Sequence, residues 1–254
     1  MIRIEGLEKS FNRPVLNGIT LAVPTGQVLG YLGANGAGKT TTIKILTGQL
    51  KPTAGTVTVG GHDVSREPAR VKALIGYVPE TLAVYEQLTP MEFLRFVGAL
   101  HDLGDAEVTR TATKFLEFLD LARERDQRMS SFSKGMRKKV VLASALLHRP
   151  KVLFLDEPLD GLDANAVVQL KELIRRLAED GVTVFYSSHV LDVVEKVCDR
   201  IVILKDGRIA ADGTMEALRA GRAGMSLEEV FSSLTTTEDL KARARGFYDG
   251  LRSA

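Results

Sequence analysis

The chain has 254 residues, 44% hydrophobic and 26% charged, which is enough for a large buried core in one or two globular domains. Its 34 Lys and Arg residues are balanced by 32 Asp and Glu residues, and the resulting net charge of +2 excludes a whole-molecule attraction to nucleic acid or anionic lipid. The single cysteine, Cys198, excludes an internal disulfide or a cysteine metal cluster and fits a reducing compartment.

The sequence predicts neither a targeting segment nor a membrane-spanning segment. The opening residues "MIRIEGLEKSF" lack a basic stretch followed by an apolar run, so no signal peptide is expected. The longest apolar run, "VVLASALL" at 140–147, is far shorter than the roughly 20 residues that cross a bilayer. We therefore expect that the chain does not span a membrane by itself.

Residues 1–65 are predicted to be mostly β-structure. Short runs rich in β-branched residues are bounded by Gly, Pro and Asn turn residues. The runs are "IRIEGL" (2–7), "GITLAV" (18–23), "GQVLGYLG" (26–33) and "GTVTVGGHDV" (55–64).

A phosphate-binding loop is predicted between the third of these strands and a helix. The stretch "GANGAGKT" (33–40) fits the pattern G-x-x-x-x-G-K-[ST], and its flanks argue against an ordinary glycine-rich turn. Glycines let the backbone wrap a phosphate, Lys39 reaches the outer phosphates, and Thr40 offers its hydroxyl to Mg²⁺. The nucleotide-contacting residues expected here are Gly33, Ala34, Asn35, Gly36, Ala37, Gly38, Lys39, Thr40 and Thr41.

A helical insert is predicted at about 85–148. Its first helix starts at "TPMEFLRFVGAL" (89–100), where Thr89 is the N-cap, Pro90 follows it and Glu92 completes a capping box. A second helix is indicated by the 3.6-residue period of 105–122. A third follows the stretch "SFSKGMRKK" (131–139), whose last three cations we expect to be solvated or paired with acids.

The stretch "VLFLDEP" (152–158) is predicted to be a buried strand that ends in two acids with different roles. Asp156 would hold Mg²⁺ directly or through water, and Glu157 would orient and deprotonate the attacking water. A water in line with the γ-phosphate makes the protein a hydrolase rather than a kinase. A pair of exposed strand-end carboxylates is the plainer alternative.

The apolar strand "VTVFYSSH" (182–189) brings His189 to the same sheet edge, where it would contact the γ-phosphate or the water unless it is structural. A helix at 165–181 separates the two strands, and alternation of strands and helices implies an α/β core. A hairpin at 200–214 follows, and "SLEE" (226–229) is a capping box in the tail.

Over residues 1–220 the sequence resembles the nucleotide-binding subunits of ATP-binding cassette (ABC) transporters. Five motifs carry this resemblance, in this order: "GANGAGKTT", "SFSKGMRKK", "LFLDEP", "LDGLD" and "SSH". The resemblance implies a P-loop NTPase core with a mixed, mainly parallel sheet, an antiparallel β subdomain and an inserted helical subdomain. It also implies ATP and Mg²⁺ as cofactors, a cassette over 1–220, and a short C-terminal helical extension over 221–254.

Cassettes of this family dimerise head to tail and trap two ATP molecules at the joint. The resemblance therefore implies a dimer with a second copy or with a homologous cassette. It places Phe11 against adenine, although a core phenylalanine at a strand end fits the sequence equally. The residues that match contacts to the partner's ATP are Ser133, Lys134, Gly135, Met136 and Asp163.

Three positions depart from the usual family pattern. Lys134 and Met136 stand where Gly and Gln are commonest in the signature motif. Glu80 in "IGYVPE" stands where Gln usually follows Y-x-P, and its carboxylate supplies an oxygen that can bind Mg²⁺ or its water. The expected metal-binding residues are therefore Thr40, Glu80 and Asp156.

The motifs "YVPE" and "SKGM" and the tail "SLEEVFSSL" most resemble the exporter branch that works with a separate ABC-2 type permease. The implied location is the cytoplasm, on the inner face of the cell membrane, with no nucleic-acid partner. The loop that contains Leu82, Val84 and Tyr85 either receives a helix of that permease or packs under the helical insert.

Two other functions compete with an ATPase subunit of a transporter. A mechanochemical ABC ATPase acting on ribosomes or DNA would carry two cassettes in one chain or a long coiled coil, and this sequence has neither. A small-molecule kinase would need an acceptor pocket and an arginine-bearing lid, and it would gain nothing from Glu157 beside Asp156.

Overall fold

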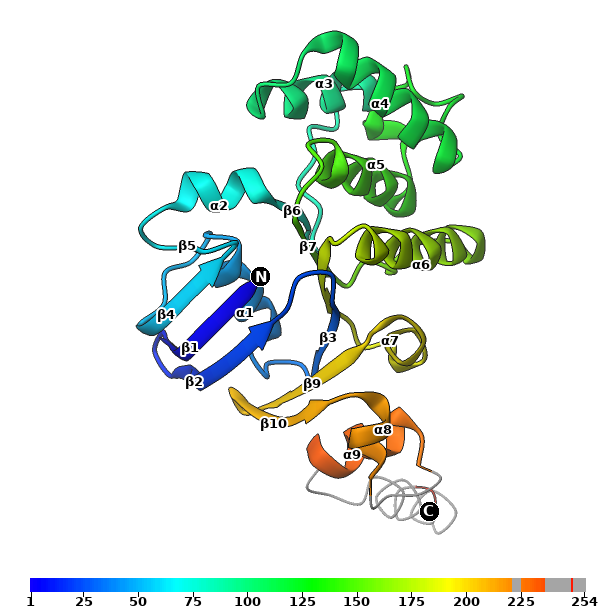
Figure 1. The fold of residues 1–254 in the computed structure, drawn as a ribbon. Coiled ribbons are helices and arrows are strands. Elements are labelled where there is room, and N and C mark those ends of the chain that lie inside the picture. Colours follow the sequence, from blue (N-terminus) through cyan, green and yellow to red (C-terminus); the bar gives the residue numbers. More distant parts are fainter. Residues whose placement is uncertain (221–224, 236–247, 249–254) are drawn as a thin grey trace.

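The computed structural model describes residues 1–220, 225–235 and 248, and two β-sheets organise this part of the chain (Figure 1). The smaller sheet is antiparallel with strand order β2-β1-β4-β5, and the larger has the order β10-β9-β3-β8-β7-β6. All neighbours in the larger sheet are parallel except β9 and β10, which form the predicted hairpin. The strands are β1 (Ile2–Ser10), β2 (Pro14–Val23), β3 (Val28–Gly33), β4 (Ala54–Val59), β5 (His62–Asp63), β6 (Ile75–Val78), β7 (Val152–Asp156), β8 (Thr183–Ser187), β9 (Arg200–Lys205) and β10 (Arg208–Gly213).

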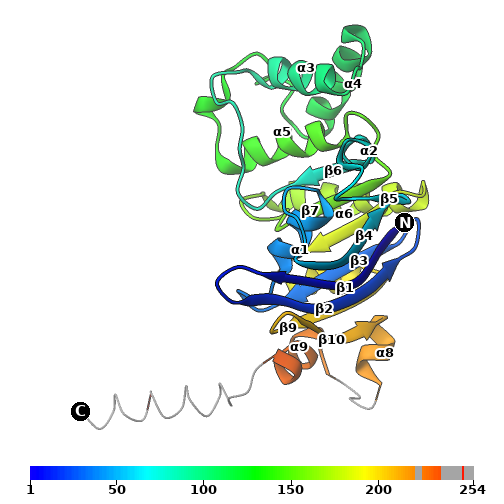
Figure 2. The same ribbon diagram turned by 90° about the vertical axis from the view of Figure 1, so that its left-hand side faces the viewer.

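The helices lie in separate groups around the sheets. The predicted insert forms one end of the molecule and α8 and α9 the other, as both views show (Figure 1 and Figure 2). None of the helices in the described residues is long and apolar enough to cross a bilayer. The helices are α1 (Lys39–Leu46), α2 (Pro68–Leu74), α3 (Pro90–Leu100), α4 (Asp105–Phe118), η1 (Met129–Ser131), α5 (Lys134–Leu146), α6 (Ala164–Glu179), α7 (Leu191–Val197), α8 (Met215–Arg219) and α9 (Leu227–Thr235).

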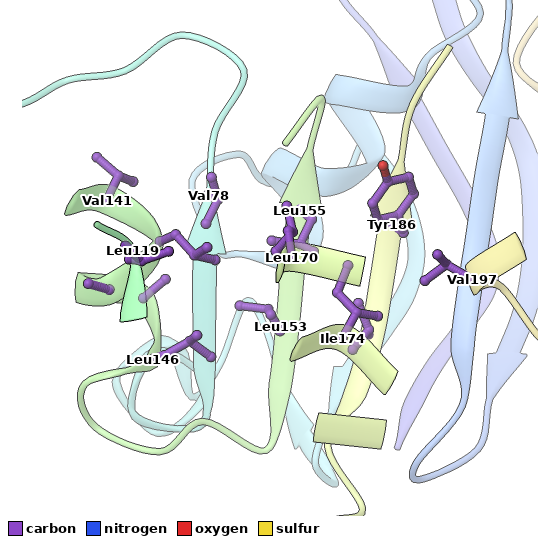
Figure 3. Packing of buried hydrophobic residues seen from close by; sticks show 14 of the residues in the cluster. Val78, Leu119, Val141, Leu146, Leu153, Leu155, Leu170, Ile174, Tyr186 and Val197 are labelled. Atoms are coloured by element: carbon purple, nitrogen blue, oxygen red, sulfur yellow. The ribbon is translucent and has the colours of Figure 1, made fainter. Parts of the chain in front are cut away.

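The central strands of the larger sheet are buried on both faces, because neighbouring residues of these strands enter different hydrophobic clusters. In β7, Leu153 and Leu155 pack in the cluster under the helices, and Phe154 packs toward the antiparallel sheet and α1. Figure 3 shows the first cluster, with Leu170 and Ile174 of α6 beside β7. Strands buried on both faces explain the continuous apolar runs in the sequence.

The two predicted capping boxes are present and set the start of helices. The Thr89 hydroxyl accepts from the Glu92 amide, and the Glu92 carboxylate accepts from the Thr89 amide. Ser226 and Glu229 make the same pair of bonds before α9. The other residues of the predicted extension over 221–254, apart from 225–235 and 248, lie outside the described part of the chain.

The short elements α2 and β6 were not predicted from the sequence. They have 7 and 4 residues, too few to display a helical or strand period. Tertiary packing defines them, since β6 pairs with β7 and lies against α5.

The contact between β6 and α5 allows no side chain at Gly76, which gives a stability test. A Cβ atom there would lie 2.2 Å from the Ala145 carbonyl oxygen, so Gly76→Ala should destabilise the fold by about 1–3 kcal/mol through overpacking. Urea unfolding measures the loss. Gly104→Ala is the control, because it meets no atom within 4 Å and has φ of −68°. Equal unfolding midpoints for the two variants would contradict this packing.

Candidate functional site

The predicted phosphate loop lies between β3 and α1, at the carboxyl edge of the larger sheet. Gly36 and Gly38 adopt φ angles of 81° and 111°, which side chains rarely tolerate. At Gly38 a Cβ atom would also lie 2.5 Å from a methyl carbon of Leu16. This backbone conformation turns the loop tightly into the helix, so that the loop and the helix N-terminus face one point.

Lys39 is folded back on its own loop. Its Nζ donates to the Gly33 carbonyl at 2.7 Å and to the Ala34 carbonyl at 3.3 Å. Burial lowers the pKa of Lys39, and the nearby carboxylates of Glu157, Asp156 and Glu80 oppose that shift. The lysine therefore has acids beside it and hydrogen bonds that phosphate oxygens can replace.

An open cleft of about 670 Å³ joins the loop to the acids. It brings together many of the sequence-predicted residues, and it adds Arg13 and Val15, which sequence reasoning missed. The signal for Arg13 is a cation two residues after Phe11, close to the first strand. The residues that line the cleft are Arg13, Val15, Asn35, Gly36, Gly38, Lys39, Thr40, Thr41, Glu80, Asp156, Glu157 and His189.

Phe11 is not among the lining residues. Its side chain is 60% exposed, and the Lys9 ammonium lies 5.0 Å from its ring centroid. The alternative of a core phenylalanine is wrong, because the ring is not buried. An exposed ring beside the cleft-lining Arg13 leaves stacking on adenine as a prediction.

Asp156 is a buried acid at the end of β7, and one of its carboxylate oxygens is available to a ligand. Its Oδ2 is buried and accepts no hydrogen bond within the described residues. Burial raises the pKa of this carboxyl group, Ser187 lowers it, and the charges of Glu80 and Glu157 raise it further. A buried carboxylate oxygen that accepts no hydrogen bond is suited to bind a cation.

The same edge could hold Mg²⁺ with few protein ligands. The described residues contain no cluster of three or more His, Cys, Asp or Glu side chains suited to a metal. Thr40, Glu80 and Asp156 all line the cleft beside the phosphate loop. One hydroxyl and two carboxylates match a Mg²⁺ ion that keeps water and phosphate oxygens as its other ligands.

Glu157 and His189 form a hydrogen-bonded pair at the cleft. His189 Nδ1 lies 2.8 Å from Glu157 Oε2, and the same oxygen accepts from the Ser188 hydroxyl at 3.2 Å and the His189 amide at 3.3 Å. The carboxylate side chain is 12% exposed, whereas that of His189 is 71% exposed. One oxygen of Glu157 is thus held by the chain, which aims the carboxylate at the cleft.

The backbone of Glu157 is also constrained. Its φ angle is 49°, a left-handed conformation that costs an L-residue about 1 kcal/mol or more. The Glu157 amide donates to the Ser187 carbonyl at 2.9 Å, which links the ends of β7 and β8.

The residues matched to the partner's ATP lie outside the cleft. Ser133 caps α5, with its hydroxyl accepting from the Met136 amide at 3.2 Å. A Cβ at Gly135 would lie 2.2 Å from the Gly161 carbonyl oxygen, so the helix start and the 159–163 loop touch through backbone. Lys134 pairs with Asp160 in that loop, and Asp163 caps α6. The chain brings these residues together, but away from its own phosphate loop.

The predicted environment of Arg137, Lys138 and Lys139, solvated or paired with acids, is only partly confirmed. Arg137 pairs with Glu86 at 2.5 Å and Lys139 with Asp163 at 3.2 Å, which confirms pairing with acids. Lys138 is 1% exposed and donates to a backbone carbonyl, so it is not solvated, and no acid of the described residues pairs with it. The sequence expectation was wrong there because α5 packs that side against the end of β7.

In the loop between β6 and α3, Leu82 and Val84 pack partly against the main core, while contact with a permease helix stays a prediction. Tyr85 is 61% exposed and meets only the edge of the Phe96 ring among the described aromatic residues, with centroids 5.5 Å apart. Leu82 and Val84 also line a second cleft of about 380 Å³ with Glu80 and Lys134.

Comparison with known proteins places this arrangement among ATP-binding cassettes. A family model described as "ABC transporter" matches residues 16–160. Linearmycin resistance ATP-binding protein LnrL of Bacillus subtilis is 36% identical over 215 residues, 84% of this chain and 69% of the relative. Daunorubicin resistance ATP-binding protein DrrA3 of Streptomyces coeruleorubidus is 37% identical over 230 residues, 90% of this chain and 73% of the relative.

Solved structures share the fold. The ATP-binding subunit of an ABC transporter superimposes with a TM-score of 0.88 at 34% identity, covering 92% of this chain and 99% of the other. A dimeric ATP-binding cassette in a post-hydrolysis state with ADP and phosphate superimposes with a TM-score of 0.79 at 23% identity, covering 85% and 99%. The expected α/β P-loop NTPase fold with its antiparallel sheet and helical insert is confirmed.

The position of Lys39 gives a binding test. Lys39→Met removes the cation that we expect to bind the phosphate oxygens, and the loss of such charge-assisted bonds should lower ATP affinity by about 10- to 100-fold. Titration with a fluorescent ATP analogue measures it. Lys44→Met is the control, because Lys44 is an exposed lysine in the last turn of the same helix. Equal affinities for the two variants would exclude Lys39 from phosphate binding.

Proposed function

The chain belongs to the ABC transporter family as an ATP-hydrolysing nucleotide-binding subunit, and from that premise we propose how its residues share the work of an exporter. Residues 1–220 form the cassette, with the helical insert at about 85–148, and 221–254 form a short extension. One observation supports the proposal most: a phosphate loop, a buried unpaired carboxylate and an oriented glutamate line one cleft.

Glu157 acts as the general base in this proposal. Its carboxylate lines the cleft and is oriented by His189 and Ser188, so it can accept a proton from a water in line with the γ-phosphate. Lys39 leaves its own loop carbonyls and binds the outer phosphates. His189 is largely exposed and, in this proposal, contacts the γ-phosphate or the water.

Thr40, Glu80 and Asp156 are the proposed residues that hold Mg²⁺. When bound, this ion supplies positive charge that neutralises the phosphate oxygens during transfer. Asp156 contributes a buried carboxylate oxygen that lacks a partner in the described residues. Glu80 brings a second carboxylate to the same cleft, so this chain places a negative charge beside the metal that a glutamine there would lack.

The cleft lacks the signature residues, which supports a site completed by a second cassette. Ser133 at the N-terminus of α5 offers amides and a helix dipole to a phosphate, yet it lies outside the cleft that holds Lys39. In a head-to-tail dimer, Ser133, Lys134, Gly135, Met136 and Asp163 of one copy face the ATP of the other. The second cassette is another copy of this chain or a homologue.

The membrane partner is proposed to be an ABC-2 type permease on whose cytoplasmic side the protein sits. Its similarity to LnrL and DrrA3, which are linearmycin and daunorubicin resistance ATP-binding proteins, supports drug export. The exposed Tyr85 and the cleft beside Leu82 and Val84 provide a mixed apolar and charged surface for a short permease helix. No observation in the described residues favours a mechanochemical role or a kinase.

The role of Glu157 gives the main functional test. Glu157→Gln keeps the size of the side chain but removes its basicity, so ATP hydrolysis should fall by at least about 100-fold while ATP still binds. ATP held without hydrolysis should also trap a dimer on size-exclusion chromatography. Glu172→Gln on the exposed face of α6 is the matched control.

Two results would count against this assignment. Hydrolysis near the wild-type rate in Glu157→Gln would remove Glu157 as the base. A variant that binds ATP without hydrolysing it, yet stays monomeric at every concentration tested, would argue against a site shared by two copies.

A further inference from the structure

Lys138 makes a contact that the proposed reaction does not yet use. It lies one turn into α5, after the Ser133 cap, and only 1% of the residue is exposed. Its Nζ donates to the backbone carbonyl of Glu157 at 2.6 Å. Helix α5, which begins at the signature residues and is called the signature helix below, thus carries a buried lysine that holds the peptide group of Glu157, the proposed base.

The environment of Lys138 indicates a specific role for this hydrogen bond. Burial lowers the pKa of Lys138; the charges of Asp160, Glu157 and Glu80 oppose that shift and that of Lys134 adds to it. Among the described residues no carboxylate lies within ion-pair distance of its ammonium, although Lys134 and Lys139 on the same helix each have one. Burying an ammonium without a carboxylate partner costs free energy, so the hydrogen bond to the Glu157 carbonyl is important for keeping Lys138 in place.

The carbonyl that accepts this bond belongs to a strained residue. Glu157 has the left-handed φ of 49°, and its carbonyl also accepts from the Asp160 amide at 3.3 Å. That backbone conformation sets the direction in which the side chain leaves β7 toward His189. Strain of this kind persists only where surrounding contacts hold it in place.

We propose that Lys138 is a positioning residue that holds the left-handed backbone of Glu157 and so aims its carboxylate at the water. The inference rests on the proposed role of Glu157. Because Ser133 and Lys138 belong to one helix, it also gives a mechanical link: the helix that binds the partner's ATP is the helix that holds the base of its own site. Each site would then be set by docking at the other.

Lys138→Met tests the proposal, because methionine keeps the length and apolar stem of lysine and removes the donor. We expect kcat to fall by about 10- to 100-fold, with the KM for ATP within about twofold of the wild type, since only the base is displaced. Lys138→Arg retains a cationic donor and should recover a large part of kcat. Lys114→Met, an exposed lysine of α4, is the control.

A second measurement separates positioning from closure of the dimer. In a Glu157→Gln background, adding Lys138→Met should leave the ATP-trapped dimer unchanged, because the binding surfaces remain. Loss of that dimer, or a kcat for Lys138→Met equal to that of the control, would overturn the inference, as would a Lys138→Arg variant no more active than Lys138→Met. If Glu157→Gln alone hydrolyses ATP normally, the base assignment fails instead.

Discussion

The balance of charge between Lys39 and the acids opposite it is the constraint on which the rest of the site depends. Burial disfavours the charged form of Lys39 and of Asp156, yet the parallel sheet places both at one edge, with Glu80 and Glu157 beside them. The carboxyl ends of parallel strands meet at the same edge, so residues far apart in the sequence converge without any loop having to bridge them. In the proposed function, the cost of these buried charges is recovered when phosphates and a cation bind between them.

The second constraint is the backbone contact between α5 and the 159–163 loop. Gly135 lies so close to the Gly161 carbonyl that any side chain would separate them, and Lys134 and Lys139 pair with acids of the same loop. Helix α5, which begins at the signature residues, therefore contacts the loop that follows Glu157 in the same chain. Under the proposed function, a second cassette that moved the helix would also move the loop, and docking would thereby reach Glu157.

Sequence reasoning was strongest where a motif fixes backbone geometry. The phosphate loop, the acid pair at the end of β7 and the capping box at Thr89 were predicted from spacing alone, because each needs particular residues at fixed offsets. It failed at Lys138, which was expected to be solvated or paired with an acid, and at Arg13, which lacks a motif. It also missed α2 and β6, whose positions come from packing. Contacts between distant segments decide these cases, and no local pattern encodes them.

The most direct test of a shared site mixes two inactive variants before ATP is added. Glu157→Gln lacks the base, and Ser133→Asp keeps the α5 cap but repels the partner's γ-phosphate. A mixed dimer holds one intact site, made of the phosphate loop and base of the Ser133→Asp copy and the signature helix of the Glu157→Gln copy. Half of the dimers in an equimolar mixture are mixed, so hydrolysis should rise to about a quarter of the wild-type rate. Activity no greater than the sum of the two variants alone would contradict a site shared by two copies.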